Sequence, residues 1–346
     1  MTLIKALYAF TLFTALALPV RAGVKYYVND FLNNGGDARS VALGSAMAAD
    51  LAGRTAGLYN PAGLLGVRVI TGQLTHASLF NGQLMQDMAA VVWPMDSSRS
   101  LGATLMRSAV DEIWNTNNFE TDAEGRPIFS RSRLTYSDNA DYALGLTYAM
   151  RFGERFRAGA TANFIRRRFD DLISFGAGLD AGALFLFQNN ITLGLSVRNL
   201  TTSVNRYYAD DYEIGLPELY LGAGYRMDVE YLYGSVLFLC QFPNLLPTSG
   251  VSQGPMAGAF DNSDESPQAW DLASAGPLGF VANTGLGLEY TIRERVALRL
   301  GTNSVSTVTA GVGILLKRLT VDFAYRSHPE LSDSYRFALA WDFLRN

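Results

Sequence analysis

The sequence predicts an all-β fold, a transmembrane antiparallel β-barrel of about fourteen strands with a small N-terminal helical hatch inside its lumen. Apolar and polar residues alternate with period two along most of the chain, which is the pattern of a strand with two different faces. Of the 346 residues, 49% are hydrophobic and 12% aromatic. No segment after the N-terminus, however, is a continuous apolar run of the ~20 residues that a membrane helix needs.

The first residues have the pattern of a signal peptide. Lys5 gives a positive start, residues 6–18 are an apolar run too short to span a bilayer, and Val20-Arg21-Ala22 offers small residues before a cleavage site. We therefore expect residues 1–22 to be removed and the protein to leave the cytoplasm. The alternative is a short buried or anchoring helix.

Residues 23–66 are expected to form the hatch. The stretch 37–65 is rich in alanine, and Leu43, Met47 and Leu51 follow one another at the spacing of a helix face. Asn60-Pro61-Ala62-Gly63 then ends any helix, because the proline lacks a backbone donor and the glycine permits a tight turn. An ordinary turn after a surface helix is the alternative interpretation.

Residues 67–346 are expected to form the barrel, with alternating segments separated by polar turns. The expected strands are 67–79, 84–95, 100–112, 142–151, 156–168, 172–187, 191–200, 219–227, 231–241, 279–291, 295–302, 307–315, 319–326 and 334–344.

Loop length supports this count. The connections after the even-numbered strands are short, at 96–99, 153–154, 188–190, 228–230, 293–294 and 317–318, and the longer ones fall in the opposite set. Bacterial outer-membrane barrels have short periplasmic turns, long external loops and an even number of strands. A secreted β-sandwich shares the short alternating strands but has no reason to sort its loops in this way.

Alternation also predicts which side chains face the lumen. In the last strand Tyr335, Phe337 and Trp341 share one face, and Arg336 and Asp342 share the other. An arginine or lysine facing the middle of a bilayer costs roughly 2–4 kcal/mol, so the charged face is expected to point inward. The expected polar lining consists of Asp180, Arg198, Arg226, Arg299, Asp322, Arg326, Arg336 and Asp342. We favour a structural ion-pair lining over a substrate relay for these residues.

No residue pattern indicates catalysis or a bound cofactor. His76 and His328 lie on distant segments, with His76 expected at the lumen or the rim, and Cys240 has no neighbour arranged to activate it. The acidic run 261–265 lacks the glycine and glutamate of an EF-hand loop and is interpreted as surface charge. The net charge is −4 and the basic residues form no stripe, so the sequence gives no support for nucleic-acid binding. We therefore expect no enzyme, no metal and no cofactor.

A family resemblance adds to these inferences. The run GDARSVALGSAMAADLAGRTAGLYNPAGL resembles the N-terminal hatch of the FadL-like outer-membrane barrels, and more closely that of the shorter PorV/PorQ family. Segments such as LTHASLF, LPELYLGAGYR and SYRFALAWDF are similar to later parts of these proteins. The resemblance implies that the hatch motif comprises Arg39, Gly44, Asn60, Pro61, Ala62 and Gly63.

The resemblance implies two functions, both in the bacterial outer membrane. The first is binding or passage of hydrophobic small molecules through a hatch-plugged channel. The alternative is a PorV-like barrel that binds exported protein cargo for a type IX-like system. The connections 169–171 and 201–216 are too short for large ligand-collecting loop helices, which disfavours fatty acid as the specific substrate. The expected partners are outer-membrane lipid and the barrel-assembly machinery, which recognises a terminal strand like the one ending in Trp341 and Phe343.

Overall fold

A computed structural model describes most of the chain. The described residues are 29–115, 124, 126, 128–131, 135–169, 172–200, 203–207, 212–215, 217–229, 231, 233–242, 244–245, 284–303, 308–328 and 331–343. The expected signal peptide, the acidic run 261–265 and most of the connections 116–134 and 243–283 lie outside them.

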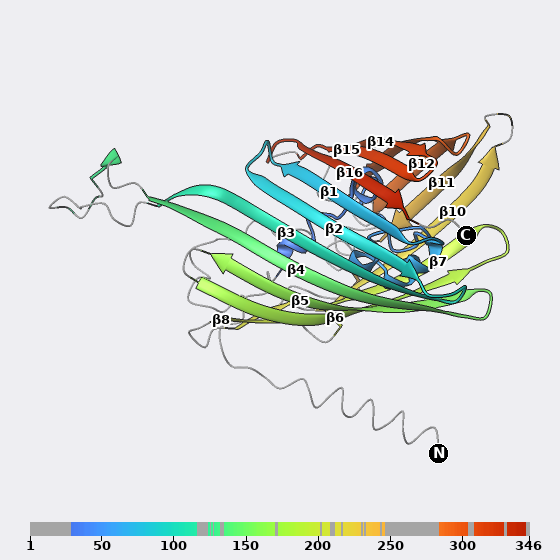
Figure 1. Cartoon of the computed structure of the whole chain (residues 1–346), viewed down its shortest axis with the longest axis horizontal. Helices are drawn as coiled ribbons and strands as arrows, with labels where there is room; N and C mark the ends of the chain where they lie inside the picture. Colours follow the sequence, from blue (N-terminus) through green and yellow to red (C-terminus); the bar gives the residue numbers. More distant parts are fainter. Residues whose placement is uncertain are drawn as a thin grey trace, which may run out of the picture.

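Fourteen antiparallel strands form a closed barrel (Figure 1). They are β1 (Thr71–Leu79), β2 (Leu84–Pro94), β3 (Arg99–Asn115), β4 (Thr135–Phe152), β5 (Phe156–Phe169), β6 (Leu172–Leu186), β7 (Ile191–Arg198), β10 (Glu218–Val229), β11 (Gly234–Gln241), β12 (Gly285–Ile292), β13 (Val296–Thr302), β14 (Thr309–Leu316), β15 (Leu319–Arg326) and β16 (Ser334–Asp342). Each strand pairs with its neighbour in this order, and β16 pairs with β1 to close the ring. The predicted number of strands is confirmed.

Two further short strands extend one hairpin of the wall. β8 (Ser203–Tyr207) pairs with the first part of β6, beyond the stretch of β6 that pairs with β7, and β9 (Tyr212–Gly215) pairs with β8. The prediction that 201–216 is only a loop is therefore wrong. The signal was weak, because SVNRY and YEIG are only five and four residues long.

The short turns lie at one end of the barrel and the longer connections begin at the other end. The short turns after β2, β4, β6, β10, β12 and β14 share one end with the last described residues of the C-terminus, on the right of Figure 1. At the opposite end β3 and β4 project beyond the other strands, further than the predicted strands 100–112 and 142–151. β1 is shorter than predicted and begins at Thr71, because residues 61–66 form a 3₁₀ helix and 67–70 connect it to the wall.

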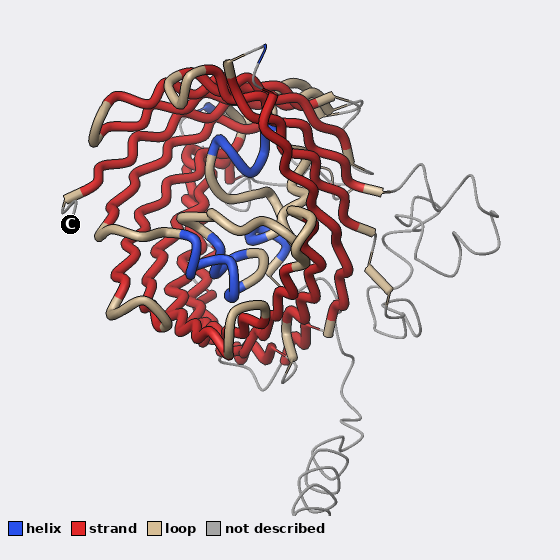
Figure 2. The backbone as a smooth tube through the Cα atoms, turned by 90° about the vertical axis from the view of Figure 1, so that its right-hand side faces the viewer, coloured by secondary structure: helices blue, strands red, loops and turns tan. Residues whose placement is uncertain are grey.

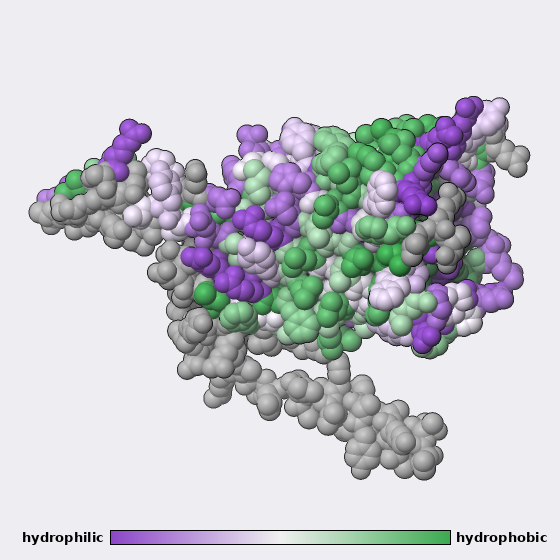
Figure 3. Space-filling view, in the orientation of Figure 1, coloured by the Kyte–Doolittle hydropathy of each residue, from purple (hydrophilic) through white to green (hydrophobic). Residues whose placement is uncertain are grey.

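Outward and inward faces alternate as expected. Along β16, Tyr335, Phe337 and Trp341 are exposed, whereas Arg336 and Ala338 are buried. Apolar side chains gather on the outside of the barrel between two more polar ends (Figure 3). Near the long-loop end this apolar surface gives way to an exposed polar group on β1 and β2, where His76 Nδ1 lies 2.7 Å from Asp87 Oδ1. His76 therefore faces outward near the rim, which agrees with the rim alternative of the prediction and not with the lumen alternative.

The N-terminal segment, residues 29–66, lies inside the ring of strands (Figure 2). It contains three 3₁₀ helices, η1 (Asp30–Leu32), η2 (Ala56–Leu58) and η3 (Pro61–Gly66), and one α-helix, α2 (Ala38–Ala42). α2 begins at the N-cap Asp37, whose carboxylate accepts a hydrogen bond from the Ser40 amide at 2.8 Å. No helix among the described residues has the length and apolar character to cross a membrane.

The helix predicted from Leu43, Met47 and Leu51 is not formed. α2 ends at Ala42, because Gly44 and Ser45 adopt positive φ angles of 63° and 57°, which a right-handed helix does not allow. Leu43 and Met47 still bury their side chains together, in a cluster with Tyr59, Leu237 and Leu239. Their apolar spacing thus reflects burial in irregular backbone instead of a helix face.

Candidate functional site: the N-terminal segment in the barrel lumen

The N-terminal segment reaches opposite parts of the wall. α2 contacts β13, β14, β15 and β16, whereas η3 contacts β3, β4, β5 and β6. Because these two groups of strands lie apart in the ring, the segment crosses the lumen between them.

Asn60 connects the segment to the wall on the η3 side. Its side chain is 1% exposed, and its amide nitrogen donates to the carbonyl of Ala48 at 2.6 Å and to those of Ala183 and Leu195 at 3.1 and 3.2 Å. Its side-chain oxygen accepts a hydrogen bond from Ala62 N and so caps η3. One buried amide therefore joins two parts of the N-terminal segment to strands β6 and β7.

Inward-facing glycines let the backbone of the segment approach the wall. A methyl group added to Gly159 would lie 2.7 Å from the carbonyl carbon of Pro61, and one added to Gly182 would lie 2.9 Å from Pro61 Cδ. On the other side, a methyl group on Gly287 would lie 2.7 Å from the carbonyl oxygen of Leu43. Side chains do not fit at these positions without a shift of the segment.

A buried group of charges, the charge cluster, joins the segment to the other side of the wall. It consists of Arg39, Asp50, Glu289, Arg299 and Asp322. Arg39 contacts Asp50 at 2.9 Å and Glu289 at 3.0 Å, and Arg299 contacts Glu289 at 2.7 Å and Asp322 at 2.6 Å. Burial alone lowers the pKa of Arg39, but the carboxylates of Asp50 and Glu289 hold this pKa well above its usual range. Each arginine of the charge cluster thus has two carboxylate partners.

A second buried group, the arginine pair, comprises Arg326 and Arg336 on β15 and β16. Both guanidinium groups donate to the same backbone carbonyl, that of Asn34, Arg326 at 3.1 Å and Arg336 through Nη2. Nη2 of Arg336 also donates to Gln86 Oε1 at 3.3 Å. Arg326 is 6% and Arg336 1% exposed.

The negative charge of Asp37, a residue of the N-terminal segment, acts on Arg336. The two carboxylate oxygens of Asp37, however, accept their hydrogen bonds from other residues. They accept hydrogen bonds from Ser40 N at 2.8 Å and from Gln73 Nε2 at 3.0 Å. Burial raises the pKa of Asp37, but these hydrogen bonds and the charge of Arg39 outweigh it and bring the pKa below its ordinary value. Asp37 is therefore held as a carboxylate by the N-cap and the wall.

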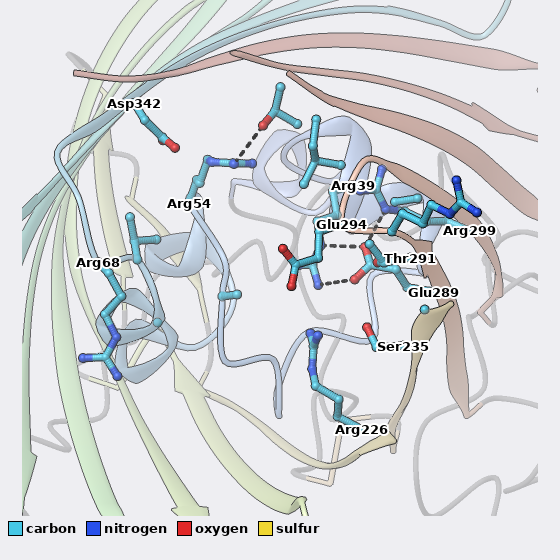
Figure 4. A pocket seen from close by; sticks show the side chains of 18 of the residues that line it. Arg39, Arg54, Arg68, Arg226, Ser235, Glu289, Thr291, Glu294, Arg299 and Asp342 are labelled. Carbon is cyan, nitrogen blue, oxygen red and sulfur yellow. Dashed lines mark hydrogen bonds and ion pairs between the residues drawn. The ribbon is translucent and has the colours of Figure 1, made fainter. Parts of the chain in front are cut away.

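A cavity of about 840 Å³, here called the vestibule, opens beneath the N-terminal segment at the short-turn end (Figure 4). Arg54 and Arg68 enter it from the segment and its connection to β1, and Arg226 enters from β10. The charge cluster borders it on the side of Arg39, Glu289 and Arg299. The vestibule is thus a polar space between the segment and the short-turn end.

The structure distributes the predicted lining residues over several places. Arg299 and Asp322 lie in the charge cluster, Arg326 and Arg336 form the arginine pair, and Arg226 and Asp342 line the vestibule. Asp180 accepts hydrogen bonds from Asn163 and from the Asn199 amide, and Arg198 donates to Asn33 Oδ1 at 3.2 Å. These residues do not converge on one point.

The predicted motif residues all lie in the segment's contacts with itself or with the wall. Arg39 is in the charge cluster, and Asn60, Pro61 and Ala62 contact β5 and β6. Gly63 faces the carbonyl of Asp50, and the Gly44 carbonyl accepts a hydrogen bond from Asn303 at 3.2 Å.

Several important residues were missed from the sequence. Glu289 and Asp50 complete the charge cluster, and Gln73 and Gln86 hold the segment from β1 and β2. An inward position of Glu289 could have been predicted, because Gly285, Gly287 and Glu289 share one face of a strand whose other face is apolar. No comparable pattern marks Asp50, whose position depends on the irregular backbone of residues 43–55.

No protein-family model matches the sequence, and no curated protein matches it. Solved structures do match. The toluene transporter TbuX of Ralstonia pickettii is 12% identical with a TM-score of 0.55, over 90% of this chain and 99% of that chain. The toluene transporter TodX of P. putida is 10% identical with a TM-score of 0.55, over 90% and 99% of the two chains. The CymD monoaromatic hydrocarbon channel is 12% identical with a TM-score of 0.53, over 90% and 98%.

At these identities the likeness establishes a shared fold. The barrel fold that the FadL-like resemblance implies is confirmed, whereas the grouping with the PorV/PorQ family stays a prediction.

Proposed function

We propose that this protein is an outer-membrane channel that binds and passes hydrophobic small molecules, with the N-terminal segment as the hatch that closes it. The observation that carries the proposal is the packed segment across the lumen of a closed barrel with an apolar outer surface. The shared fold with toluene transporters and a monoaromatic hydrocarbon channel supports the choice of ligand.

The inner wall supports an apolar ligand as well. Met88, Met106 and Ile165 are buried on inward-facing positions of β2, β3 and β5, where they pack with Phe31 of the segment. A channel for ions or sugars has a polar lumen, so thioether and aliphatic side chains at these positions favour an apolar solute. Phe31 contributes a phenyl ring to this patch, which makes the patch chemically suitable for an aromatic hydrocarbon.

The outside of the barrel supports a membrane location. Exposed Phe, Leu, Tyr and Trp side chains would be costly in water as one continuous surface but are favourable against lipid tails. In this proposal residues 1–22 are a cleaved signal peptide, 23–66 are the hatch and 67–346 form the outer-membrane barrel. The barrel-assembly machinery then recognises the terminal strand that ends in Trp341 and Phe343.

The motif residues have specific roles in this proposal. Asn60, Pro61, Ala62 and Gly63 hold the hatch to β5 and β6, while Arg39 and Gly44 hold it to the side of β12 and β13. The polar lining residues balance charge around the hatch, and none of them is assigned to chemistry. The protein is proposed to be a channel without enzymatic activity; no cluster of His, Cys, Asp or Glu in the described part of the chain is arranged to hold a metal.

Uptake measurements test this function. Cells that express the protein in the outer membrane are expected to accumulate radiolabelled toluene faster than cells that express the variant Met106→Glu, because a buried carboxylate on the apolar patch disfavours an apolar solute. The exposed outward-facing substitution Leu105→Ala on the same strand is the matched control. Equal toluene uptake by wild type, Met106→Glu and cells without the protein would exclude hydrocarbon passage through this lumen.

A further inference from the structure

The arginine pair holds two positive charges that no carboxylate contacts within the described residues. Neither guanidinium group has a carboxylate oxygen within 4.0 Å there, whereas Arg39 and Arg299 of the charge cluster each contact two carboxylates. Moving a charged group from water into a protein costs several kcal/mol unless a partner compensates for it. A neutral carbonyl shared by two guanidinium groups is a weak compensation.

Several donors of the pair are also without a protein acceptor. Nε of Arg326, and Nε and Nη1 of Arg336, are buried and have no hydrogen-bond partner in the described part of the molecule. Buried donors are normally satisfied, so three such nitrogens on two adjacent strands indicate a site for an acceptor that the described residues do not supply. Asp37 does not supply it, because its oxygens accept hydrogen bonds from Ser40 N and Gln73 Nε2 and none from the pair.

The free donors of Arg336, the more deeply buried of the two arginines, select the shape of the anion. A guanidinium group binds a carboxylate bidentately along either of two edges, and Nη2 belongs to both of them. In Arg336 this Nη2 is already engaged by Asn34 and Gln86. The remaining donors, Nε and Nη1, do not share an edge. A spherical anion accepts single hydrogen bonds from separate directions and does not need a free edge.

We propose that Arg326 and Arg336 form a binding site for a monovalent halide ion, chloride under physiological conditions, next to the carbonyl of Asn34. The site lies on the long-loop side of the N-terminal segment, since Arg326 is the last residue of β15 and Arg336 is near the start of β16. The bound anion holds the two strands and the turn at Asn34 together. This inference does not depend on which solute the channel passes.

Equilibrium dialysis of the full detergent-purified chain against radiolabelled chloride tests the site. Wild type is expected to bind chloride saturably at one site per chain, and sodium bromide but not sodium acetate is expected to displace it. Arg336→Met and Arg326→Met are each expected to lose this binding. Arg226→Met is the matched control, because it removes the same charge from an exposed position on the inner wall.

The outcomes separate clearly. Absence of saturable chloride binding in wild type, or equal binding in wild type and both pair variants, overturns the proposal. Displacement by acetate as effectively as by bromide overturns the spherical-anion assignment. Heat-modifiable gel migration reports whether each variant is folded, and Arg336→Gln, which keeps a polar side chain but not the charge, is expected to lose chloride binding even if Arg336→Met fails to fold.

Discussion

Two groups of buried arginines lie in the same lumen and differ in how their charges are balanced. Arg39 and Arg299 share three carboxylates in the charge cluster, with contacts between 2.6 and 3.0 Å. Arg326 and Arg336 share one backbone carbonyl and have donors left over. Burial of an arginine therefore does not by itself indicate a salt bridge, and the two groups have different roles.

The charge cluster links two chain regions that are far apart in sequence. Arg39 and Asp50 come from the N-terminal segment, while Glu289, Arg299 and Asp322 come from β12, β13 and β15. On the opposite side the segment is held without charge, by the Asn60 amide and by close contact with glycines. The rate at which a protease cleaves the N-terminal segment in an otherwise folded barrel reports how strongly each of these contacts holds the segment.

The largest effect is expected from Glu289→Gln. Removal of one partner from a buried ion pair costs about 3 kcal/mol, because the remaining charges stay buried. Cleavage of the N-terminal segment is therefore expected to accelerate roughly 100-fold if cleavage follows the open population. Asp228→Asn, an exposed carboxylate in the same vestibule, is the control and should leave the rate unchanged. Similar rates for both variants would mean that the charge cluster does not hold the segment.

Asn60→Leu is expected to have the next largest effect. It leaves the carbonyls of Ala48, Ala183 and Leu195 without their shared donor, at a cost of about 2 kcal/mol. Leakage of a small hydrophilic solute through reconstituted protein should increase, while the melting temperature of the barrel should change little. Parent-level leakage would make the turn a simple connector, and a collapse of the melting temperature would place the segment in the folding core of the barrel.

Gly182→Ala tests the neutral contacts on that side. The added methyl group would overlap Asn60 Oδ1 and lie 2.9 Å from Pro61 Cδ, so the turn has to shift at a cost of about 1 kcal/mol. Gly145→Ala is the matched control, because its methyl group would meet only wall residues such as Asn163 and Thr161. The expected result is faster cleavage of the N-terminal segment in Gly182→Ala than in Gly145→Ala. The reverse order would contradict the close packing of the turn against β6.

The smallest effect is expected from Arg336→Met in chloride-free buffer. Replacement of an uncompensated buried charge by an apolar side chain of similar length is often neutral or stabilising, so the cleavage rate should stay at or below the parent rate. In high chloride the parent should become more resistant than the variant, because only the parent gains stability from binding. A large acceleration in chloride-free buffer would show that Arg336 is as well compensated as Arg299, and the contrast between the two groups would fail.

The sequence predicted the strands of the barrel better than the N-terminal segment inside it. Period-two alternation and turn spacing identified fourteen strands, and β15 was predicted at its observed bounds, because a strand's two faces meet different solvents. The helix expected over Leu43, Met47 and Leu51 failed, because backbone at Gly44 and Ser45 turns left-handed where the segment meets β12 and β13. Alternation assigned Arg299 and Arg336 to the inner face, but it carries no information about which one meets a carboxylate.

We propose that the N-terminal segment closes the barrel, and electrical conductance in planar bilayers measures this closure. Fourteen strands enclose more space than the wall side chains fill, so a chain that lacks residues 37–65 should form a folded barrel with a sharply raised conductance. The double variant Asn60→Leu with Glu289→Gln keeps the whole chain and should show a smaller rise or frequent openings. Heat-modifiable migration confirms folding in both cases. If both folded proteins conduct no more than the parent, the segment does not close the lumen, and the proposed hatch is wrong.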